Sequence, residues 1–315
     1  MARAKNNRTL MLTEAEIPAL RQHLLSADDV RQGASWQDHV VNADLIDVLP
    51  WLPDASADLI IIDPPYNLTK TYGGKAFRAR GEQAYEAYLR TWLHDVCCKL
   101  RPHGSLYLCG DWHNTASLQR VLSEELTIIN RITWQREKGR GAQHNWKNGM
   151  EDIWFAVKDP DHYYFDVSAV MVKRRVMAPY RQDGQPKDWQ ETDGGKFRLT
   201  CPSNFWDDIS VPFWSMPENT DHPTQKPEKL LAKLILASSR PGDMVFDPFA
   251  GSGTTCVVAR KLGRSFCGVE QVEEYCLWAQ KRLEMAETDP SIQGYADGVF
   301  WERNARSLAD KKKLR

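Results

Sequence analysis

Several features that would narrow the class of this 315-residue protein are missing from its sequence. Its seven cysteines include no Cys-x-x-Cys pair, so we expect reduced core thiols and no metal site. No apolar run approaches the roughly 20 residues that cross a bilayer. The basic start at residues 1–5 is not followed by the apolar core of a signal peptide. We therefore expect a cytoplasmic protein without a membrane span.

The sequence also lacks an excess of one charge, since its net charge is −1. Overall charge therefore gives no argument for a nucleic-acid partner. Lysine and arginine are unevenly distributed, however, and gather in the segments 67–82, 131–147 and 171–198. A locally basic surface on a neutral protein fits a polyanion. Any one of these segments, taken alone, is better explained as a solvated loop.

Residues 58–62 form a continuous apolar run that is typical of a strand buried on both faces. Strand and helix patterns alternate before and after it, which predicts an α/β protein with a doubly wound, mostly parallel sheet. Ligands of such sheets bind at the carboxyl ends of the strands. The expected strands are 39–41, 58–62, 105–109, 127–134, 151–157, 244–246 and 266–269, and the expected helices are 45–52, 84–100, 226–238, 254–262 and 272–286.

The first of two loops that carry chemistry spans residues 247–255, Asp-Pro-Phe-Ala-Gly-Ser-Gly-Thr-Thr, between a predicted strand and a predicted helix. Glycines there allow the backbone to approach a ligand closely. The loop is not a P-loop, because no Gly-Lys-Ser/Thr follows. Glu270 ends the next predicted strand, where a carboxylate can accept hydrogen bonds from ribose hydroxyls. Together they indicate a nucleoside or a dinucleotide ligand.

The second loop is Asp63-Pro64-Pro65-Tyr66, at the end of the strand predicted at 58–62. Two prolines fix φ and remove backbone donors, which predicts a rigid turn presenting a carboxylate, carbonyl groups and an aromatic face. Acceptors for both N–H groups of an exocyclic amine would favour the ammonium-like transition state of its alkylation. The alternative interpretation is a structural Pro-Pro turn with a capping aspartate.

These two loops and the segment 222–227, His-Pro-Thr-Gln-Lys-Pro, resemble the DNA amino-methyltransferases. The catalytic tetrapeptide precedes the glycine loop, as in the circularly permuted β group of adenine-N6 enzymes. The resemblance covers roughly residues 38–285. It implies a Rossmann-like methyltransferase fold with a loop-rich inserted target-recognition region, S-adenosyl-L-methionine as the cofactor and DNA as the substrate.

The resemblance also implies roles for individual residues. Asp63 and the Pro64 carbonyl would bind the adenine amine, beside Pro65, and Tyr66 would stack on the flipped base. The implied cofactor-binding residues are Asp44, Thr224, Lys226, Asp247, Pro248, Phe249, Ala250, Gly251, Ser252, Gly253, Thr254 and Glu270. Lys226 would pair with the methionine carboxylate and Glu270 would bind the ribose. Asp44 and Thr224 each have an alternative interpretation as a helix cap.

We expect residues 36–135 and 221–290 to form the catalytic domain, flanked by an N-terminal extension, 1–35, and a tail, 291–315. The insertion 136–220 is the candidate for target recognition, and the loop 67–82 is expected to close over the flipped base. The candidate DNA-binding residues are Lys70, Arg136, Lys138, Arg140, Arg174, Arg175 and Arg181. A homodimer and a cognate restriction endonuclease are further expected partners, from the resemblance alone.

Three other functions stay open at this point. A cytosine-N4 methyltransferase is the nearest, although such enzymes usually have Ser in place of Asp63. Protein- or RNA-directed amino-methyltransferases also use a Pro-Pro-aromatic turn, but usually with Asn first and the glycine loop upstream. A non-catalytic DNA-binding module that kept the fold is a different class, and the intact catalytic and cofactor motifs argue against it.

Overall fold

The protein is described by a computed structural model that covers residues 6–72, 75–136, 143–144, 146–177, 180–192 and 195–302. Within these ranges a nine-stranded sheet runs in the order β1-β2-β16-β15-β3-β6-β8-β7-β14. Neighbouring strands from β1 to β6 are parallel, and β8 is antiparallel to β6 and β7. The strands are β1 (Leu24–Ser26), β2 (His39–Asn42), β16 (Ser265–Glu270), β15 (Met244–Asp247), β3 (Ala57–Ile62), β6 (Leu100–Asp111), β8 (Met150–Val157), β7 (Thr127–Gln135) and β14 (Phe205–Trp206).

The apolar strand β3 explains the layering of the molecule. All six of its residues are buried, and alternate side chains point to opposite faces of the sheet. Leu59 and Ile61 belong to one hydrophobic cluster, and Ile60 and Ile62 belong to another. The first cluster includes residues of α7 (Glu228–Ser238), α8 (Thr254–Lys261) and α9 (Glu273–Thr288). The second includes residues of α2 (Ala27–Arg31), α3 (Leu45–Val48), α4 (Glu82–Arg90), α5 (Leu93–Lys99) and α6 (Thr115–Glu125).

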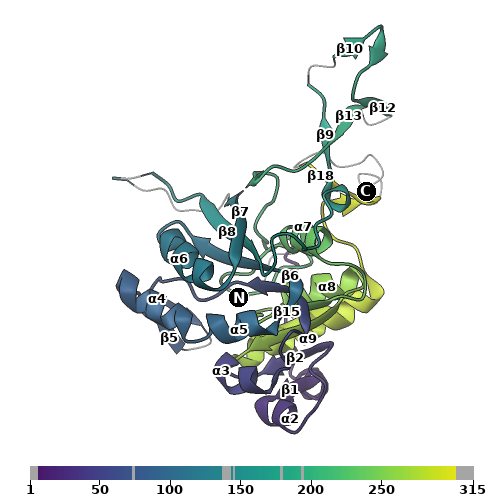
Figure 1. Ribbon diagram of the computed structural model, residues 1–315. Coiled ribbons are helices and arrows are strands. Elements are labelled where there is room, and N and C mark those ends of the chain that lie inside the picture. The colour runs from purple at the N-terminus through teal and green to yellow at the C-terminus, as the bar shows by residue number, and fades with distance from the viewer. Residues whose placement is uncertain are drawn as a thin grey trace.

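Helices therefore cover both faces of the sheet, and Figure 1 shows these two helical layers on either side of it. The predicted α/β class with a mostly parallel sheet is confirmed. Three further helices in the described residues are short: α1 (Ile17–Arg21), η1 (Leu49–Trp51) and η2 (Ser168–Val170).

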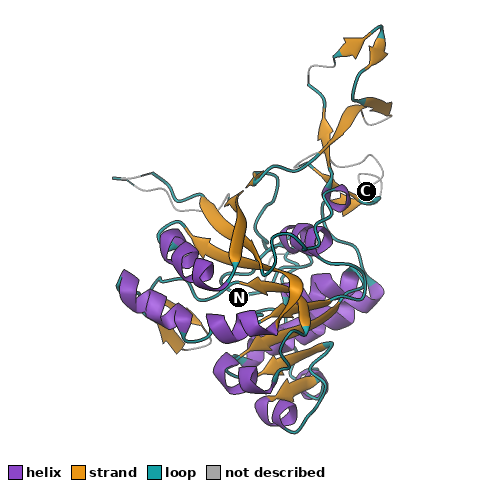
Figure 2. Ribbon diagram, in the orientation of Figure 1, coloured by secondary structure: helices purple, strands orange, loops and turns teal. Residues whose placement is uncertain are grey.

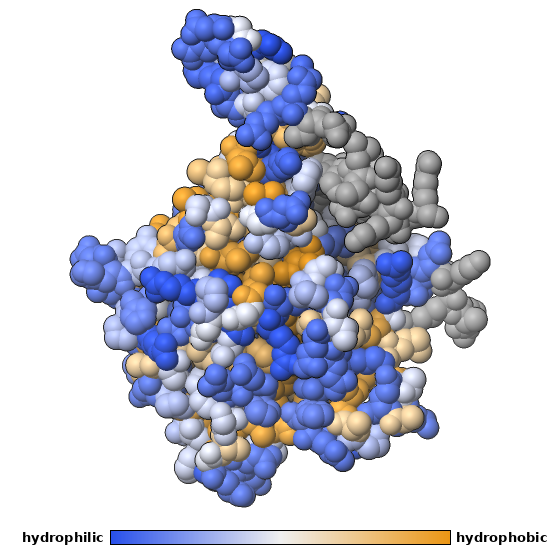
Figure 3. Space-filling view, turned by 90° about the vertical axis from the view of Figure 1, so that its right-hand side faces the viewer, coloured by the Kyte–Doolittle hydropathy of each residue, from blue (hydrophilic) through white to orange (hydrophobic). Residues whose placement is uncertain are grey.

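A second, five-stranded sheet has the order β12-β13-β9-β18-β17. It combines β12 (Gln190–Thr192), β13 (Gly195–Thr200) and β9 (Val172–Arg175) with β18 (Val299–Trp301) and β17 (Tyr295–Ala296). The hairpin of β10 (Arg181–Gln182) and β11 (Gln185–Pro186) lies at its far end. We call the described residues of 172–200 the arm. The arm projects from the body (Figure 2), and its surface is mostly hydrophilic (Figure 3).

Several strand pairings cross the domain boundaries expected from the sequence, and the division into domains stays a prediction. Within the range 1–35, expected as an extension, β1 pairs with β2 at the sheet edge. Within 136–220, β8 lies inside the main sheet, because its apolar side chains fit between β6 and β7. Within 291–315, β18 pairs with β9 of the arm. These pairings join strands that are far apart in the chain, so the composition along the sequence did not indicate them.

Two local expectations were wrong. The expected helix 84–100 is two helices, α4 and α5, because the backbone of Trp92 leaves the helical conformation. The expected loop 67–82 contains an antiparallel pair, β4 (Lys70–Tyr72) with β5 (Lys75–Phe77). Its glycines suggested a loop throughout, but Gly73 and Gly74 fall between the two short strands and Gly81 is the N-cap of α4.

Two searches of the described residues complete the picture of the fold. No helix in them is long and apolar enough to span a bilayer. Nor do they contain a cluster of three or more His, Cys, Asp or Glu side chains that could hold a metal ion.

Candidate active site

The two loops singled out in the sequence lie side by side at one edge of the sheet. Asp63 directly follows β3, and Asp247 ends β15, the parallel neighbour of β3. Glu270 ends β16, which is parallel to β15 on its other side. Asp44 follows β2, the next parallel strand. Because the carboxyl ends of parallel strands share one edge, residues far apart in the chain line a single cavity of about 380 Å³.

The cavity is lined by Asp63, Pro64, Pro65 and Tyr66 and by most of the predicted cofactor residues. The latter are Asp44, Thr224, Lys226, Asp247, Pro248, Phe249, Ala250, Gly251, Ser252, Thr254 and Glu270. Gly253 serves another purpose: a Cβ there would lie 2.4 Å from the Ala279 Cβ, so the glycine allows α8 to pack closely on α9. The structure thus brings eleven of the twelve predicted cofactor residues to one cavity.

The glycine loop is shaped for close approach. Gly251 has φ +52°, and a Cβ there would lie 3.0 Å from His222 Nε2. The Gly251 amide donates to Glu270 Oε2 at 3.0 Å, and the Val272 amide donates to Glu270 Oε1 at 2.8 Å. Each carboxylate oxygen keeps capacity for a further hydrogen bond, as binding of ribose hydroxyls requires. Burial raises the pKa of Glu270.

Asp247 anchors the start of the same loop. Its side chain is buried and accepts the Phe249 amide at 3.0 Å. Burial is the main reason that the pKa of Asp247 rises to about 7. Asp44 is the N-cap of α3 and accepts the Ile46 amide at 3.1 Å, so its capping role is real and coexists with its place in the cavity wall.

Asp63, Tyr66 and Lys226 line the cavity, and together with Glu151, which contacts the last two, they form what we call the catalytic corner. Lys226 Nζ lies 2.6 Å from Asp63 Oδ2, 3.1 Å from the Tyr66 hydroxyl and 3.3 Å from Glu151 Oε2. The Tyr66 hydroxyl donates to Glu151 Oε2 at 3.1 Å. Burial disfavours the Lys226 ammonium, but the charges of Asp63 and Glu151 outweigh it and raise its pKa.

The second oxygen of Asp63 is in a different situation. Asp63 Oδ1 is buried, and no described residue donates a hydrogen bond to it. A buried acceptor without a partner costs about 1–3 kcal/mol, so its retention beside a cavity is typical of a site completed by a ligand. The arrangement suits a donor such as an amine.

Tyr66 is held by its hydroxyl rather than left free. It is 8% exposed, and Lys226 Nζ lies 5.2 Å from its ring centroid. Burial, followed by the charge of Asp63, raises the pKa of Tyr66 well above its usual value, so the hydroxyl stays protonated. The ring lines the cavity, where stacking on a base remains a prediction.

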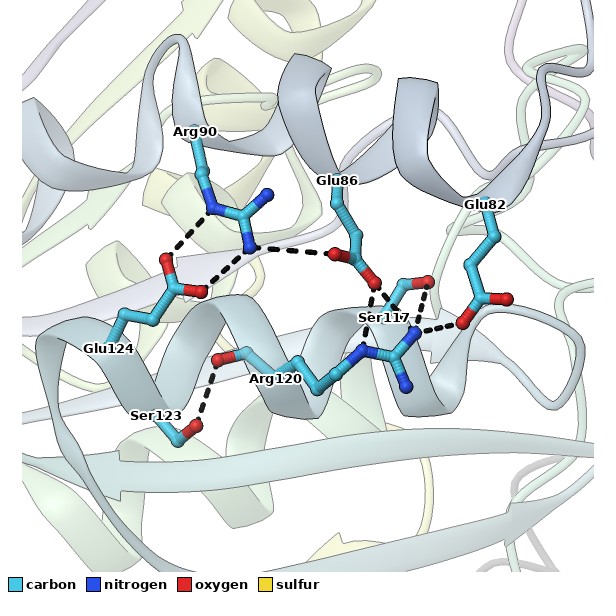
Figure 4. A network of polar contacts seen from close by, with 7 residues as sticks. All are labelled: Glu82, Glu86, Arg90, Ser117, Arg120, Ser123 and Glu124. Atoms are coloured by element: carbon cyan, nitrogen blue, oxygen red, sulfur yellow. Dashed lines mark hydrogen bonds and ion pairs between the residues drawn. The ribbon is translucent and has the colours of Figure 1, made fainter.

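One wall of the cavity comes from the helix α4 and the turn after it. Tyr88, Thr91 and Trp92 line it, and the Trp92 ring meets the Phe249 ring edge-on at 4.9 Å. On its outer side, α4 is tied to α6 by five charged residues (Figure 4). Arg90 Nε donates to Glu124 at 2.9 Å, and Arg120 Nε donates to Glu86 at 2.9 Å; Arg120 also pairs with Glu82. This network helps to hold the wall in place.

The predicted DNA-binding residues fall into two groups. Arg174, Arg175 and Arg181 lie on the arm, and Arg181 is exposed. Lys70 and Arg136 lie near the catalytic corner: Arg136 pairs with Glu151, and burial, followed by the charge of Arg136, lowers the pKa of Lys70. Lys138 and Arg140 lie outside the described residues. The role of all seven in binding DNA remains a prediction.

Sequence reasoning missed Glu151 and gave no role to His222. Glu151 lies at the start of the apolar strand β8, where a charged residue that becomes 3% exposed gives no signal beyond its position. His222 belongs to the segment 222–227 and lies against Gly251. Burial lowers the pKa of His222 to about 3, so the ring is neutral at neutral pH.

Comparison with known proteins agrees with this geometry. Residues 57–281 match the family described as DNA methylase. The chain belongs to this family. This DNA methylase is also 35% identical over 258 residues to the "DNA adenine methyltransferase YhdJ" of Escherichia coli (strain K12), covering 78% of this chain and 83% of the relative. It is 32% identical to the "Type II methyltransferase M.HpaI" of Haemophilus parainfluenzae, covering 78% of this chain and 74% of that relative.

Solved structures agree on the fold. The PvuII DNA methyltransferase (cytosine-N4-specific) superposes with a TM-score of 0.60 at 20% identity, covering 80% of this chain and 90% of that one. The M1.HpyAVI–SAM complex superposes with a TM-score of 0.51 at 20% identity, covering 78% of this chain and 98% of that one. The predicted family of DNA methyltransferases and its fold are confirmed.

Proposed function

We propose that this DNA methylase transfers the methyl group of S-adenosyl-L-methionine to the N6 amine of adenine within a specific DNA site. The observation that carries the proposal is the shared cavity. Its lining joins the Glu270 carboxylate and the glycine loop to a buried aspartate oxygen, Asp63 Oδ1, that has no hydrogen-bond partner among the described residues. The name of the relative YhdJ agrees with a DNA substrate and with adenine as the target base.

The residues of the glycine end fit the cofactor. Glu270 presents two oxygens toward the cavity edge, and Gly251 leaves room that a side chain would fill. The edge-to-face pair of Trp92 and Phe249 offers an apolar surface for a purine. When bound, S-adenosylmethionine supplies an electrophilic methyl group on a sulfonium.

The catalytic corner then accounts for activation of the amine. The target adenine must leave the duplex stack to reach this depth, which costs a few kcal/mol. We propose that Asp63 Oδ1 and the Pro64 carbonyl accept its two N6–H bonds. As the N–C bond forms and the C–S bond breaks, the adenine nitrogen becomes positive, and the Asp63 charge stabilises it before a proton leaves. Tyr66 would support the base by stacking.

Cytosine-N4 methylation is the second candidate, because the PvuII enzyme that shares this fold is named for it. At 20% identity that likeness concerns the fold alone. Asp63 at the head of the tetrapeptide favours adenine in this chain.

The test is methyl transfer from tritiated S-adenosylmethionine to DNA, followed by digestion to nucleosides and chromatography. N6-methyladenine as the labelled product supports the proposal. N4-methylcytosine would replace it with the second candidate, and a protein that binds S-adenosylmethionine but labels no DNA would reject both.

A second copy of the chain and a cognate restriction endonuclease remain proposed partners, and a cytoplasmic location remains a proposal too. "Type II" in the name of M.HpaI concerns that relative. Sedimentation of the protein with and without DNA tests the dimer, and fractionation of producing cells tests the location. Cleavage of unmethylated DNA by a neighbouring gene product tests the endonuclease.

A further inference from the structure

Lys226 is already engaged with protein groups and not free for the cofactor carboxylate to which the resemblance assigned it. Its ammonium donates hydrogen bonds to Asp63 Oδ2 at 2.6 Å and to the Tyr66 hydroxyl at 3.1 Å. It also lies 3.3 Å from Glu151 Oε2, as an ion pair. A further anion at Lys226 would compete with the two buried carboxylates for its charge. Lys226 is therefore better suited to holding Asp63 than to holding the cofactor.

Glu151 completes this arrangement from outside the catalytic loop. It lies on β8, its side chain is 4% exposed, and both of its oxygens are engaged. Oε2 faces the Tyr66 hydroxyl and Lys226 Nζ, and Oε1 pairs with Arg136. A buried carboxylate with this many charged and polar partners is firmly oriented. It can orient Lys226 and Tyr66 in turn.

We propose that Glu151 is a positioning residue for methyl transfer: it fixes Lys226 and Tyr66, and through Lys226 it holds Asp63 with one oxygen bound and the other turned to the target amine. The contrast between the two carboxylates supports this role. Both oxygens of Glu151 have partners, whereas Asp63 Oδ1 has none among the described residues. The inference rests on the proposed function, because it assumes that Asp63 receives the amine.

The same β-strand offers a matched control. Asp152 follows Glu151 on β8, is also 3% exposed, and points to the other face of the sheet. There it accepts a hydrogen bond from Thr133 Oγ1 at 2.9 Å and lies 3.7 Å from Arg131 Nε. Glu151→Gln and Asp152→Asn each remove one buried negative charge and keep the side-chain shape. Only the first touches the catalytic corner.

The pH dependence of the rate gives a readout that a merely structural role would not change. Burial lowers the pKa of Lys226, and the charges of Asp63 and Glu151 overcome this effect. Without the Glu151 charge, Lys226 should lose its proton at a lower pH, and Asp63 should then lose its donor. The other titratable groups around Lys226 are Tyr66, Lys70, Cys109 and His222, which the variant leaves in place.

The experiment measures the single-turnover rate of methyl transfer from pH 7 to 10 with saturating S-adenosylmethionine and DNA. Calorimetric binding of S-adenosylmethionine and thermal unfolding are measured beside it. We expect Glu151→Gln to bind the cofactor within about twofold of the wild type and to transfer methyl about 10- to 100-fold more slowly, as for a misplacement of ~1 Å. Its rate should also fall at a lower alkaline pH than that of the wild type.

Three outcomes would each overturn the proposal. The first is a transfer rate of Glu151→Gln within twofold of the wild type, and the second is an equal loss of rate in Asp152→Asn. The third is a pH–rate profile of Glu151→Gln that falls at the same alkaline pH as that of the wild type. If Glu151→Gln does not fold, Glu151→Asp replaces it. It keeps the charge and shortens the side chain by one methylene, so methyl transfer should still be slower than in Asp152→Asn, whereas the fall of the rate at alkaline pH should stay close to that of the wild type. The identity of the base is measured separately on the wild type. A cytosine product would therefore reject the proposed function while leaving the comparison of the variants intact.

Discussion

The catalytic corner and the arm use the same kinds of charged side chain in opposite ways. In the catalytic corner, Lys226 is 9% exposed and has three polar partners at 3.3 Å or less. In the arm, Arg181 is exposed; its guanidinium stands over the Trp189 ring and donates to the Gly184 carbonyl. Lys173 similarly lies over the Trp301 ring, 4.4 Å from its centroid.

The difference shows how burial decides what a charge can do. A buried ammonium must be paired, so Lys226 is committed to its neighbours and serves the geometry of the site. An exposed cation such as Arg181 keeps most of its hydration even where it stands over a ring, and remains able to meet a phosphate. Substitutions in the catalytic corner should therefore alter the rate of transfer, and those in the arm should alter DNA affinity and its salt dependence.

The sharpest test of this contrast is Asp63→Ala. Removal of the carboxylate leaves the amine without its charged acceptor, and we expect methyl transfer to fall by at least about 10³-fold. Cofactor binding, measured by calorimetry, should change little, because Asp63 follows β3 and Glu270 ends β16, two strands away in the sheet. A variant that still transfers methyl at the wild-type rate would remove Asp63 from the mechanism.

The second test uses Asp247, whose pKa is about 7 in the folded protein against roughly 3.9 in an unfolded chain. The folded state binds this proton more tightly, so the contribution of Asp247 to stability is fully present below about pH 4. It is lost as the pH rises through 7. Asp247→Asn cannot ionise, so between pH 4 and 8 its free energy of unfolding should rise relative to that of the wild type by about 4 kcal/mol. The measurement is urea unfolding of both proteins at each pH. The same change of unfolding free energy with pH in the variant and the wild type would contradict the prediction.

The third test compares two glycines with positive φ. Gly251→Ala and Gly263→Ala place a side chain at φ +52° and +72°, which costs about 1–2 kcal/mol in each case. Only the Gly251 Cβ meets a neighbour, His222 at 3.0 Å, and only Gly251 lines the cavity. We expect both variants to lose similar stability and only Gly251→Ala to weaken S-adenosylmethionine binding, by about tenfold. Equal binding constants would show that the backbone does not approach the cofactor there.

The smallest expected effect belongs to the arm. Arg181→Ala should lower DNA affinity several-fold for all sequences and reduce the slope of log affinity against log salt by about 1. Arg31→Ala is the matched control, because Arg31 also stands over a ring, that of Trp51, but lies on α2 at the opposite end of the molecule (Figure 1). If the slope of log affinity against log salt is unchanged in Arg181→Ala, Arg181 does not contact a DNA phosphate.

Much of the fold followed from local pattern. The apolar run of β3 marked a strand buried on both faces, and β15 and β16 were recognisable on either side of α8. The pairing partners did not follow from it: β8 carries Glu151 and Asp152 near its start, and nothing along the chain shows that it lies beside β6. The break between α4 and α5 was missed because the apolar spacing continues across it.

The sequence by itself determined the chemistry of the two loops, their order and the family. Those properties depend on side-chain type and on the strand ends that carry Asp63, Asp247 and Glu270, and parallel strands bring such ends together whatever lies between them. Only the tertiary structure decided that Lys226 binds Asp63 and that Glu151 stands behind both. Those contacts join β3, β8 and the segment before α7, and the packing of distant strands, rather than spacing along the chain, sets which buried charges become neighbours.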